Sequence, residues 1–404
     1  MNVDLMRWID YRAGVPLCSI ASLLTRMFLR KKPCRPKKVL LIELSEMGSA
    51  ILVDPAMQKL KKEFGAELYF AIFEGNKPSL SLLNTVDDSH IFTIRETSVS
   101  SLVGDSLRFL RWARREQIDT VIDLELFSRY TALLTGLSGA ANRVGFHRFH
   151  NEGLYRGHML TRRVSYNPHI HIAKNFIALV NSLMVTQPEM PYSKTIVGDD
   201  EIRLRKADVS ETEIEEVRKT VVKHCPTFDR SRHKLVLINA NASDLLPQRR
   251  WERSNYVQVA RSILDRYESA IILLTGAESE REGLAALAGD VNHERCVNFA
   301  GAVAFRQLPA LYCSSLLMIS NDSGPAHFAA VTNMPTFVLF GPETPKLYGS
   351  LGPTTPIYAG LACSPCVSAW NHRKTACVDN VCLRSITPEQ VLQAVEPSLK
   401  AACS

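Results

Sequence analysis

The eight residues Ser320-Asn321-Asp322-Ser323-Gly324-Pro325-Ala326-His327 decide which fold this sequence predicts. They follow an apolar run at residues 316–319, which is typical of a buried parallel strand, and they precede an apolar helical segment that begins at Phe328. A polar cluster that ends a strand and opens a helix lies at the edge where open α/β sheets bind ligands. The stretch therefore predicts an α/β fold with a binding site at this turn. An ordinary capped turn is the alternative.

The chemistry of the same turn favours an anionic ligand. Asp322 or Ser323 can cap the helix, and Gly324, which has no side chain, lets a ligand approach the backbone closely. The free N–H groups and the positive end of a helix together favour a diphosphate. His327, about one turn further on, is placed to donate to a phosphate oxygen.

Other predicted strands in the C-terminal half also end in polar residues. Strands are expected at residues 234–239, 270–274 and 336–340. The carboxyl ends of parallel strands meet at one edge of a sheet, so these polar residues are expected to lie together. A crevice that binds a nucleotide explains all of them at once. The three exits read Asn239-Ala240-Asn241, Thr275-Gly276-Ala277-Glu278 and Gly341-Pro342-Glu343-Thr344.

The N-terminal half shows the same alternation of strands and helices. Strands are predicted near residues 39–44, 68–73, 118–124 and 143–146, and the first two are joined by a helix at 50–64. We therefore expect two successive Rossmann-like domains whose parallel sheets face one another across a cleft. The expected divisions are an N-terminal amphipathic extension at 1–36, one domain at 37–186, an interdomain connection with a surface helix at 187–232, and a second domain at 233–404.

Composition narrows the class of protein. With 404 residues, of which 46% are apolar and 22% charged, the chain suits two globular domains. The net charge of +7 fits an anionic substrate or membrane surface, whereas the scattered basic residues argue against nucleic-acid binding. The sequence shows no secretion signal, so we expect a cytoplasmic protein in which most of the ten cysteines are free thiols.

The extension contains an apolar stretch at residues 15–29 that is followed by Arg30-Lys31-Lys32. The stretch is too short to span a membrane with confidence. Its large apolar residues recur at helical spacing, which predicts an amphipathic helix. Such a helix either lies on an anionic membrane surface, where the basic cluster meets lipid headgroups, or packs against the protein itself. The residues concerned are Leu17, Ile20, Leu24, Met27 and Phe28.

From about residue 38 to residue 395 the chain resembles the ADP-heptose:lipopolysaccharide heptosyltransferases, glycosyltransferase family 9. The most specific match is residues 322–327, which follow the family pattern Asp-Ser/Thr-Gly-x-x-His. Supporting matches are Arg249-Arg250-Trp251 and Gly276-Ala277-Glu278. Residues 363–382, with their four cysteines, also look like members of the family.

This resemblance implies a GT-B fold and transfer of heptose from ADP-heptose to a lipopolysaccharide-core or other lipid-linked acceptor at the inner face of the cytoplasmic membrane. It implies an inverting reaction that needs no metal or other cofactor, because protein groups offset the charge of the leaving diphosphate. The C-terminal domain would hold the nucleotide sugar and the N-terminal domain would face the acceptor. By match to the family motifs, the donor-binding residues are Arg249, Glu278, Asp322, Ser323, Gly324 and His327.

The sequence departs from the family at the first turn of the N-terminal domain. The family has Gly-Asp there, and the Asp is the usual candidate base, whereas this chain has Gly48-Ser49. A serine is not a carboxylate base at neutral pH, so we predict that Glu46 in the same turn is the catalytic base. Asp123 or Glu125 could take that role instead. A non-catalytic nucleotide-sugar-binding protein and a nucleotide-sugar epimerase are the remaining alternatives.

Four cysteines lie close together near the C-terminus. Cys363, Cys366, Cys377 and Cys382 have the spacing C-x2-C-x10-C-x4-C, which is compatible with a tetrahedral zinc site. A disulfide staple or a loop of reduced thiols explains the same spacing.

Overall fold

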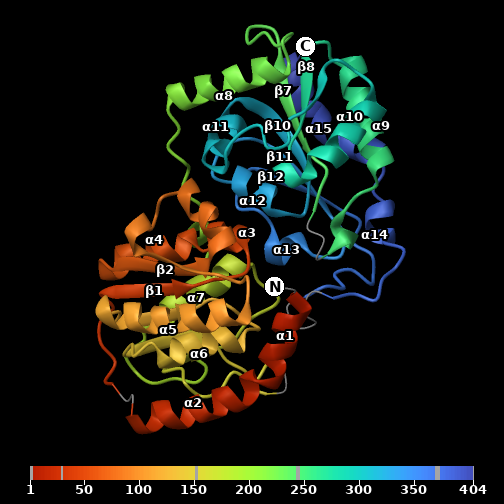
Figure 1. Ribbon diagram of the computed structural model, residues 1–404. Helices are drawn as coiled ribbons and strands as arrows, with labels where there is room; N and C mark the ends of the chain where they lie inside the picture. The colour runs from red at the N-terminus through yellow and green to blue at the C-terminus, as the bar shows by residue number, and fades with distance from the viewer. Residues whose placement is uncertain (1–2, 29–30, 151–152, 243–245, 369–373, 404) are drawn as a thin grey trace. The chain divides into compact units, whose positions relative to one another are not determined.

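Two parallel six-stranded sheets form the framework of the protein (Figure 1). The computed structural model describes residues 3–28, 31–150, 153–242, 246–368 and 374–403. The chain separates into two compact units, Met1–Arg203 and Leu204–Ser404, each built on one sheet. The expected pair of parallel α/β domains is therefore confirmed. The division after Arg203 falls inside the segment 187–232, which also contains helix α8 (Glu211–His224).

In the first unit the strands lie in the order β3-β2-β1-β4-β5-β6, and all neighbours are parallel. The central strand β1 has four fully buried apolar residues, as expected for a strand covered on both faces. The strand order reverses between β1 and β4, which is the position where open α/β sheets bind ligands. The strands are β1 (Lys38–Ile42), β2 (Glu67–Phe73), β3 (Ile91–Ile94), β4 (Thr120–Asp123), β5 (Asn142–Phe146) and β6 (Arg162–Val164).

Helices cover both faces of this sheet. Helices α4 and α7 contact one another over one face, while α5 and α6 lie together over the other. Helix α5 is capped by Ser98, whose hydroxyl accepts from the Ser101 N–H, and α4 ends at Gly65 in the left-handed conformation (φ +63°). The helices are α3 (Met47–Leu52), α4 (Asp54–Phe64), α5 (Val99–Arg115), α6 (Arg129–Leu137) and α7 (Ile172–Met184), with 3-10 turns η1 (Glu74–Leu82), η2 (Asp88–His90) and η3 (Asp200–Ile202).

Two helices precede the first sheet, where the sequence predicted one. Helix α1 spans Val3–Arg12, and α2 (Gly14–Phe28) packs against α6. A stripe of small residues on α2 makes the contact with α6. The approach is close, because a Cβ added at Gly14 would lie 2.7 Å from Cδ of Arg129. The stripe consists of Gly14, Cys18, Ala21 and Thr25. The expectation of a helix packed on the protein's own surface therefore describes this side of α2 only.

The opposite side of these two helices is apolar and exposed. Nine of the eighteen large hydrophobic residues that are exposed in the described part of the chain belong to α1 and α2. Within the described ranges no helix is both long and apolar enough to cross a membrane. The exposed residues, called here the N-terminal apolar face, are Leu5, Trp8, Tyr11, Leu17, Ile20, Leu23, Leu24, Met27 and Phe28.

The second unit repeats the architecture, with strand order β12-β11-β10-β7-β8-β9. Its order reverses between β7 and β10, so the turns after these strands occupy the ligand position of the sheet. The strands are β7 (Lys234–Asn239), β8 (Ala270–Leu274), β9 (Cys296–Asn298), β10 (Ser315–Asn321), β11 (Thr336–Phe340) and β12 (Thr354–Tyr358).

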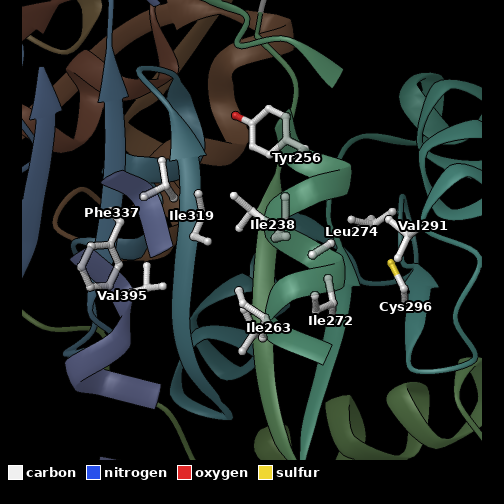
Figure 2. Close-up of a cluster of buried hydrophobic side chains, with 14 of the residues drawn as sticks. Ile238, Tyr256, Ile263, Ile272, Leu274, Val291, Cys296, Ile319, Phe337 and Val395 are labelled. Carbon is white, nitrogen blue, oxygen red and sulfur yellow. The ribbon is translucent and has the colours of Figure 1, made fainter. Parts of the chain in front are cut away.

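Figure 2 shows the apolar layer between this sheet and its helices. Ile238, Ile272 and Ile319 project from the strands toward side chains such as Ile263 and Val395, and all five are fully buried. Helices α9, α10 and α15 cover one face, and α11 and α12 the other. The helices are α9 (Arg253–Arg266), α10 (Arg281–Val291), α11 (Leu308–Cys313), α12 (Gly324–Ala329), α13 (Pro345–Tyr348), α14 (Val381–Arg384) and α15 (Pro388–Cys403), with 3-10 turns η4 (Pro247–Arg249), η5 (Glu278–Glu280) and η6 (Phe305–Gln307).

Three local features differ from the sequence-based expectation. The helix predicted at 50–64 is two helices that meet at Val53. Strands β6 and β12 were not predicted, because β6 has only three residues and two of them are arginines, while β12 contains Pro356. Both lie at the edge of a sheet, where short or proline-containing strands are tolerated.

Candidate functional site

Asn321 holds together the turns that follow β7 and β10. Its side-chain oxygen accepts from the Trp251 backbone N–H (3.2 Å) and from the Tyr256 hydroxyl (2.9 Å). Its amide nitrogen donates to the carbonyls of Ala240 (2.9 Å) and Asn241 (3.3 Å). The residue is fully buried, so each of these bonds is made away from water. One amide thus fixes the backbone on both sides of the reversal point of the sheet.

The Arg249-Arg250-Trp251 motif forms a rigid turn at the same edge. Trp251 is buried, and its indole N–H donates to the Ile386 carbonyl at 2.9 Å. Arg250 donates twice to the Ala242 carbonyl, at 2.9 and 2.6 Å. With these two side chains committed to structure, Arg249 is the arginine of the motif that is directed toward the turns after β10 and β11.

The guanidinium of Arg249 lies between two carboxylates. Its Nη2 donates to Glu343 Oε1 at 3.0 Å, and its Nε is 3.4 Å from Asp322 Oδ2. Both carboxylate side chains are almost completely buried, and that of Arg249 is 17% exposed. Asp322 follows β10 and Glu343 follows β11, so neighbouring strand exits supply the two acids. Arg249, Asp322 and Glu343 are called here the arginine cluster.

Burial controls the electrostatics of the arginine cluster. It raises the pKa of Glu343 to about 8, even though Arg249 acts to lower that pKa. It also raises the pKa of Asp322, again against the effect of Arg249. Burial alone would lower the pKa of Arg249, but the two acids outweigh it and the pKa is raised. The arginine therefore stays charged, while the acids resist carrying two negative charges.

The turn at residues 322–327 joins a strand to a helix, as predicted. Two of its residues, Ser323 and Gly324, have local roles other than the predicted ones. Ser323 occupies the N-cap of α12, but its hydroxyl donates to the Asn321 carbonyl (3.3 Å) and does not cap the helix. A Cβ at Gly324 would lie 2.9 Å from the ring of Phe328, so this glycine makes room for a phenylalanine. His327 is largely buried, in the last turn of α12.

Glu278 lies on the turn after β8, as the sequence predicted, and is exposed. Its carboxylate forms two hydrogen bonds with Arg281, at 2.6 and 2.7 Å. Gly301 packs against it, since a Cβ there would approach the Glu278 backbone to 3.0 Å. Its assignment as a donor-binding residue stays a prediction.

In the first unit, the turn after β1 contains the residues expected on the acceptor side. Glu46 precedes α3, and its Oε2 accepts from the Ser49 hydroxyl at 3.1 Å. Gly48 and Glu46 are half-buried and Ser49 is buried. The residue that replaces the family Asp thus donates directly to the glutamate predicted to serve in its place.

The other candidate bases have structural partners. Glu125 Oε1 accepts from the Leu44 N–H (3.1 Å) and from the N–H and hydroxyl of Ser45 (3.2 and 2.9 Å), which fixes the turn after β1. Asp123 is fully buried and forms an ion pair with Arg156. Burial raises the pKa of Asp123 to about 6, with Arg156 opposing the shift. Asp123 is thus removed from solvent, while Glu125, half-buried like Glu46, is engaged by the turn after β1.

The four clustered cysteines are all free thiols in the structure. Cys363 is exposed, whereas Cys366, Cys377 and the buried Cys382 each make a polar contact with a nearby residue. In the described ranges, no group of three or more His, Cys, Asp and Glu side chains is arranged to hold a metal ion. Metal binding or a disulfide at these cysteines stays a prediction.

Solved structures with the same fold extend over nearly the whole chain. The E. coli ADP-heptose lipopolysaccharide heptosyltransferase II has a TM-score of 0.68 and 20% identity, covering 90% of this chain and 99% of that one. E. coli heptosyltransferase WaaC with ADP has a TM-score of 0.60 and 17% identity, covering 89% and 99%. The protein accordingly has the GT-B fold of two Rossmann-like domains.

The family follows from the sequence comparison. The sequence model of the family described as "Glycosyltransferase family 9 (heptosyltransferase)" matches residues 106–376, and the chain belongs to this family. Lipopolysaccharide heptosyltransferase 2 of Escherichia coli is 27% identical over 124 residues, which is 30% of this chain. Lipooligosaccharide heptosyltransferase 2 of Campylobacter jejuni is 27% identical over 192 residues, or 43% of this chain. These matches span 35% and 54% of the two relatives' own lengths.

Proposed function

We propose that this protein transfers heptose from ADP-heptose to a lipopolysaccharide-core acceptor, with inversion and without a metal. The arginine cluster at the reversal point of the second sheet carries the proposal. It places a permanent cation beside the family motif at residues 322–327, where a diphosphate would bind. Membership of glycosyltransferase family 9 supports the reaction class.

On the donor side, we assign the diphosphate to Arg249 and to the turn at residues 322–327. The first N–H groups of α12 receive no side-chain cap and can donate to phosphate oxygens. His327 supplies a further donor in this assignment, and Glu278 contacts the nucleoside. As the bond from the sugar to the diphosphate breaks, these groups offset the charge that develops on ADP. Protein groups then do the work that a metal does in other transferases.

On the acceptor side, we assign the general base to Glu46. It removes the proton from the acceptor hydroxyl, whose oxygen attacks the anomeric carbon as ADP leaves from the opposite face. The hydrogen bond from Ser49 to Glu46 Oε2 supports the assignment, because it orients the carboxylate.

An exchange of carboxylates between the two positions tests this assignment. Glu46→Gln is expected to lower kcat by about 10²–10⁴-fold, the usual contribution of a general base. Adding Ser49→Asp to that variant restores the family arrangement and should recover part of the rate. Full turnover in Glu46→Gln would exclude Glu46 as the base. Donor binding without turnover in the unaltered protein would favour a non-catalytic nucleotide-sugar-binding protein.

We also propose that the N-terminal apolar face binds the inner surface of the cytoplasmic membrane. Trp8 and Tyr11 have the amphipathic rings that favour the lipid–water interface. Burying one large apolar side chain contributes roughly 1.5–3 kcal/mol, so a few of the nine residues suffice for reversible binding. Anionic lipid is the expected partner because basic residues lie within or just after these two helices in sequence, namely Arg7, Arg12, Arg26 and Lys32.

Vesicle flotation tests the membrane assignment. The protein should float with vesicles that contain phosphatidylglycerol and less with phosphatidylcholine alone. Ile20→Glu places a charge in the face and should weaken flotation. Leu107→Glu, at an equally exposed position on α5, should leave it unchanged. Equal flotation of the two variants would contradict the assignment.

The reaction is tested with the purified full chain, ADP-heptose and lipopolysaccharide acceptors from heptose-deficient cells. Release of ADP that depends on acceptor is the expected result. No release with ADP-heptose or with any other sugar nucleotide would overturn the proposed function.

A further inference from the structure

Glu343 is a buried acid in contact with the arginine proposed to hold the donor. Its side chain has no exposed area, and its Oε1 is 3.0 Å from Nη2 of Arg249. The backbone before Glu343 is held by two hydrogen bonds, because the Pro342 carbonyl accepts from the N–H groups of Cys366 (3.0 Å) and Val367 (3.1 Å). These bonds fix the backbone next to Glu343, from which its side chain reaches Arg249.

The charges of the arginine cluster create a conflict with an anionic ligand. With Asp322 and Glu343 both ionised, two negative charges surround one positive charge, and the cluster would repel a diphosphate. With one proton on the two acids, the cluster is neutral, and the guanidinium can still donate to Glu343 and remain in ion-pair contact with Asp322. Two buried carboxylates around one cation behave as a coupled pair, so the proton belongs to the pair.

We propose that Glu343 is a positioning residue for the donor: it orients Arg249, and the Asp322–Glu343 pair holds one shared proton while the diphosphate is bound. The proposal rests on the donor assignment made above. It gives a role to an acid outside the motif at residues 322–327.

The groups around Glu343 support this reading. Arg249, on η4, favours its ionised form, while Asp322, at the end of β10, opposes that form. Tyr348, on α13, also raises the pKa of Arg249, as the two acids do. Because burial outweighs the attraction of Arg249, the pKa of Glu343 is raised to about 8, which leaves the pair with a proton near neutral pH.

Donor affinity as a function of pH is the first test, by calorimetry with ADP-heptose. If only the singly protonated pair binds, affinity should fall about tenfold between about pH 7 and about pH 9. Glu343→Gln keeps an oxygen acceptor for Arg249 and removes the titration, so its affinity should be the same at both pH values. Glu343→Ala should bind weakly at both, because Arg249 loses its support. The exposed Glu268→Gln is the matched control and should follow the unaltered protein.

Thermal stability without donor separates this proposal from the proposed function. A carboxyl whose pKa is raised by folding stabilises the protein below its unfolded pKa, and this stabilisation is lost as pH rises through the folded pKa. The Tm of the unaltered protein should therefore fall between about pH 4.5 and about pH 8 more than that of Glu343→Gln.

The outcomes of the two tests are distinct. The same pH slope of affinity in the unaltered protein and Glu343→Gln would overturn the shared proton. Wild-type affinity in Glu343→Ala would overturn the positioning role. If the Tm comparison gives the expected result but ADP-heptose does not bind, the donor assignment fails and the proton on the pair stands.

Discussion

At the scale of single residues, the position of Arg249 depends on its buried neighbours. The motif alone predicts Arg249 and Asp322 as site residues, because their spacing matches a known pattern. Asn321 and Glu343 carry no comparable signal, although both lie in strand exits that the sequence marked as polar. Their roles depend on partners that are 65–94 positions away in sequence. Such contacts are set by the order of the strands, which local spacing does not reveal.

Asn321 gives a stability prediction at this scale. Asn321→Ala should lower the free energy of unfolding by roughly 2–4 kcal/mol, because the Trp251 N–H and the Tyr256 hydroxyl lose their buried acceptor. Tyr256→Phe removes one of these bonds and should cost about 1 kcal/mol. Urea unfolding of both variants measures the difference. Equal costs would show that Asn321 does not join the two turns.

At the scale of elements, helix α2 shows what apolar periodicity can and cannot predict. The helical spacing of Leu17, Ile20 and Leu24 correctly indicated an amphipathic helix. It left open whether the large residues face outward or pack against the protein, and the structure shows that the contact with α6 is made by the small ones. Close helix packing selects small residues, whereas hydrophobicity alone favours the opposite orientation.

A pair of glycine substitutions tests this packing. Gly14→Ala places a Cβ against Arg129 and should cost about 1–3 kcal/mol, with faster hydrogen exchange in α2. Gly104→Ala, in α5, meets no atom within 4 Å and should stabilise the protein by about 0.5–1 kcal/mol. Hydrogen exchange and thermal unfolding of the two variants measure both effects. A stabilising Gly14→Ala would contradict the close contact.

At the scale of the whole molecule, the alternation of strands and helices was sufficient to predict two parallel α/β units. Buried strands such as β7 and β10 are continuous apolar runs and are easily found. The edge strands β6 and β12 are not apolar runs, and sequence reasoning missed them. The ligand position of each unit follows from where its strand order reverses, which became known only with the topology.

The most direct test of the account is the mass of a lipopolysaccharide-core acceptor after incubation with ADP-heptose and the purified chain. We expect a gain of one heptose residue, with release of ADP. We expect a large loss of this product for Arg249→Ala, and a smaller loss for Arg249→Lys, which keeps the charge but not the planar fork. An acceptor of unchanged mass, or full transfer by Arg249→Ala, would contradict the central claim that the arginine cluster serves a sugar transferase.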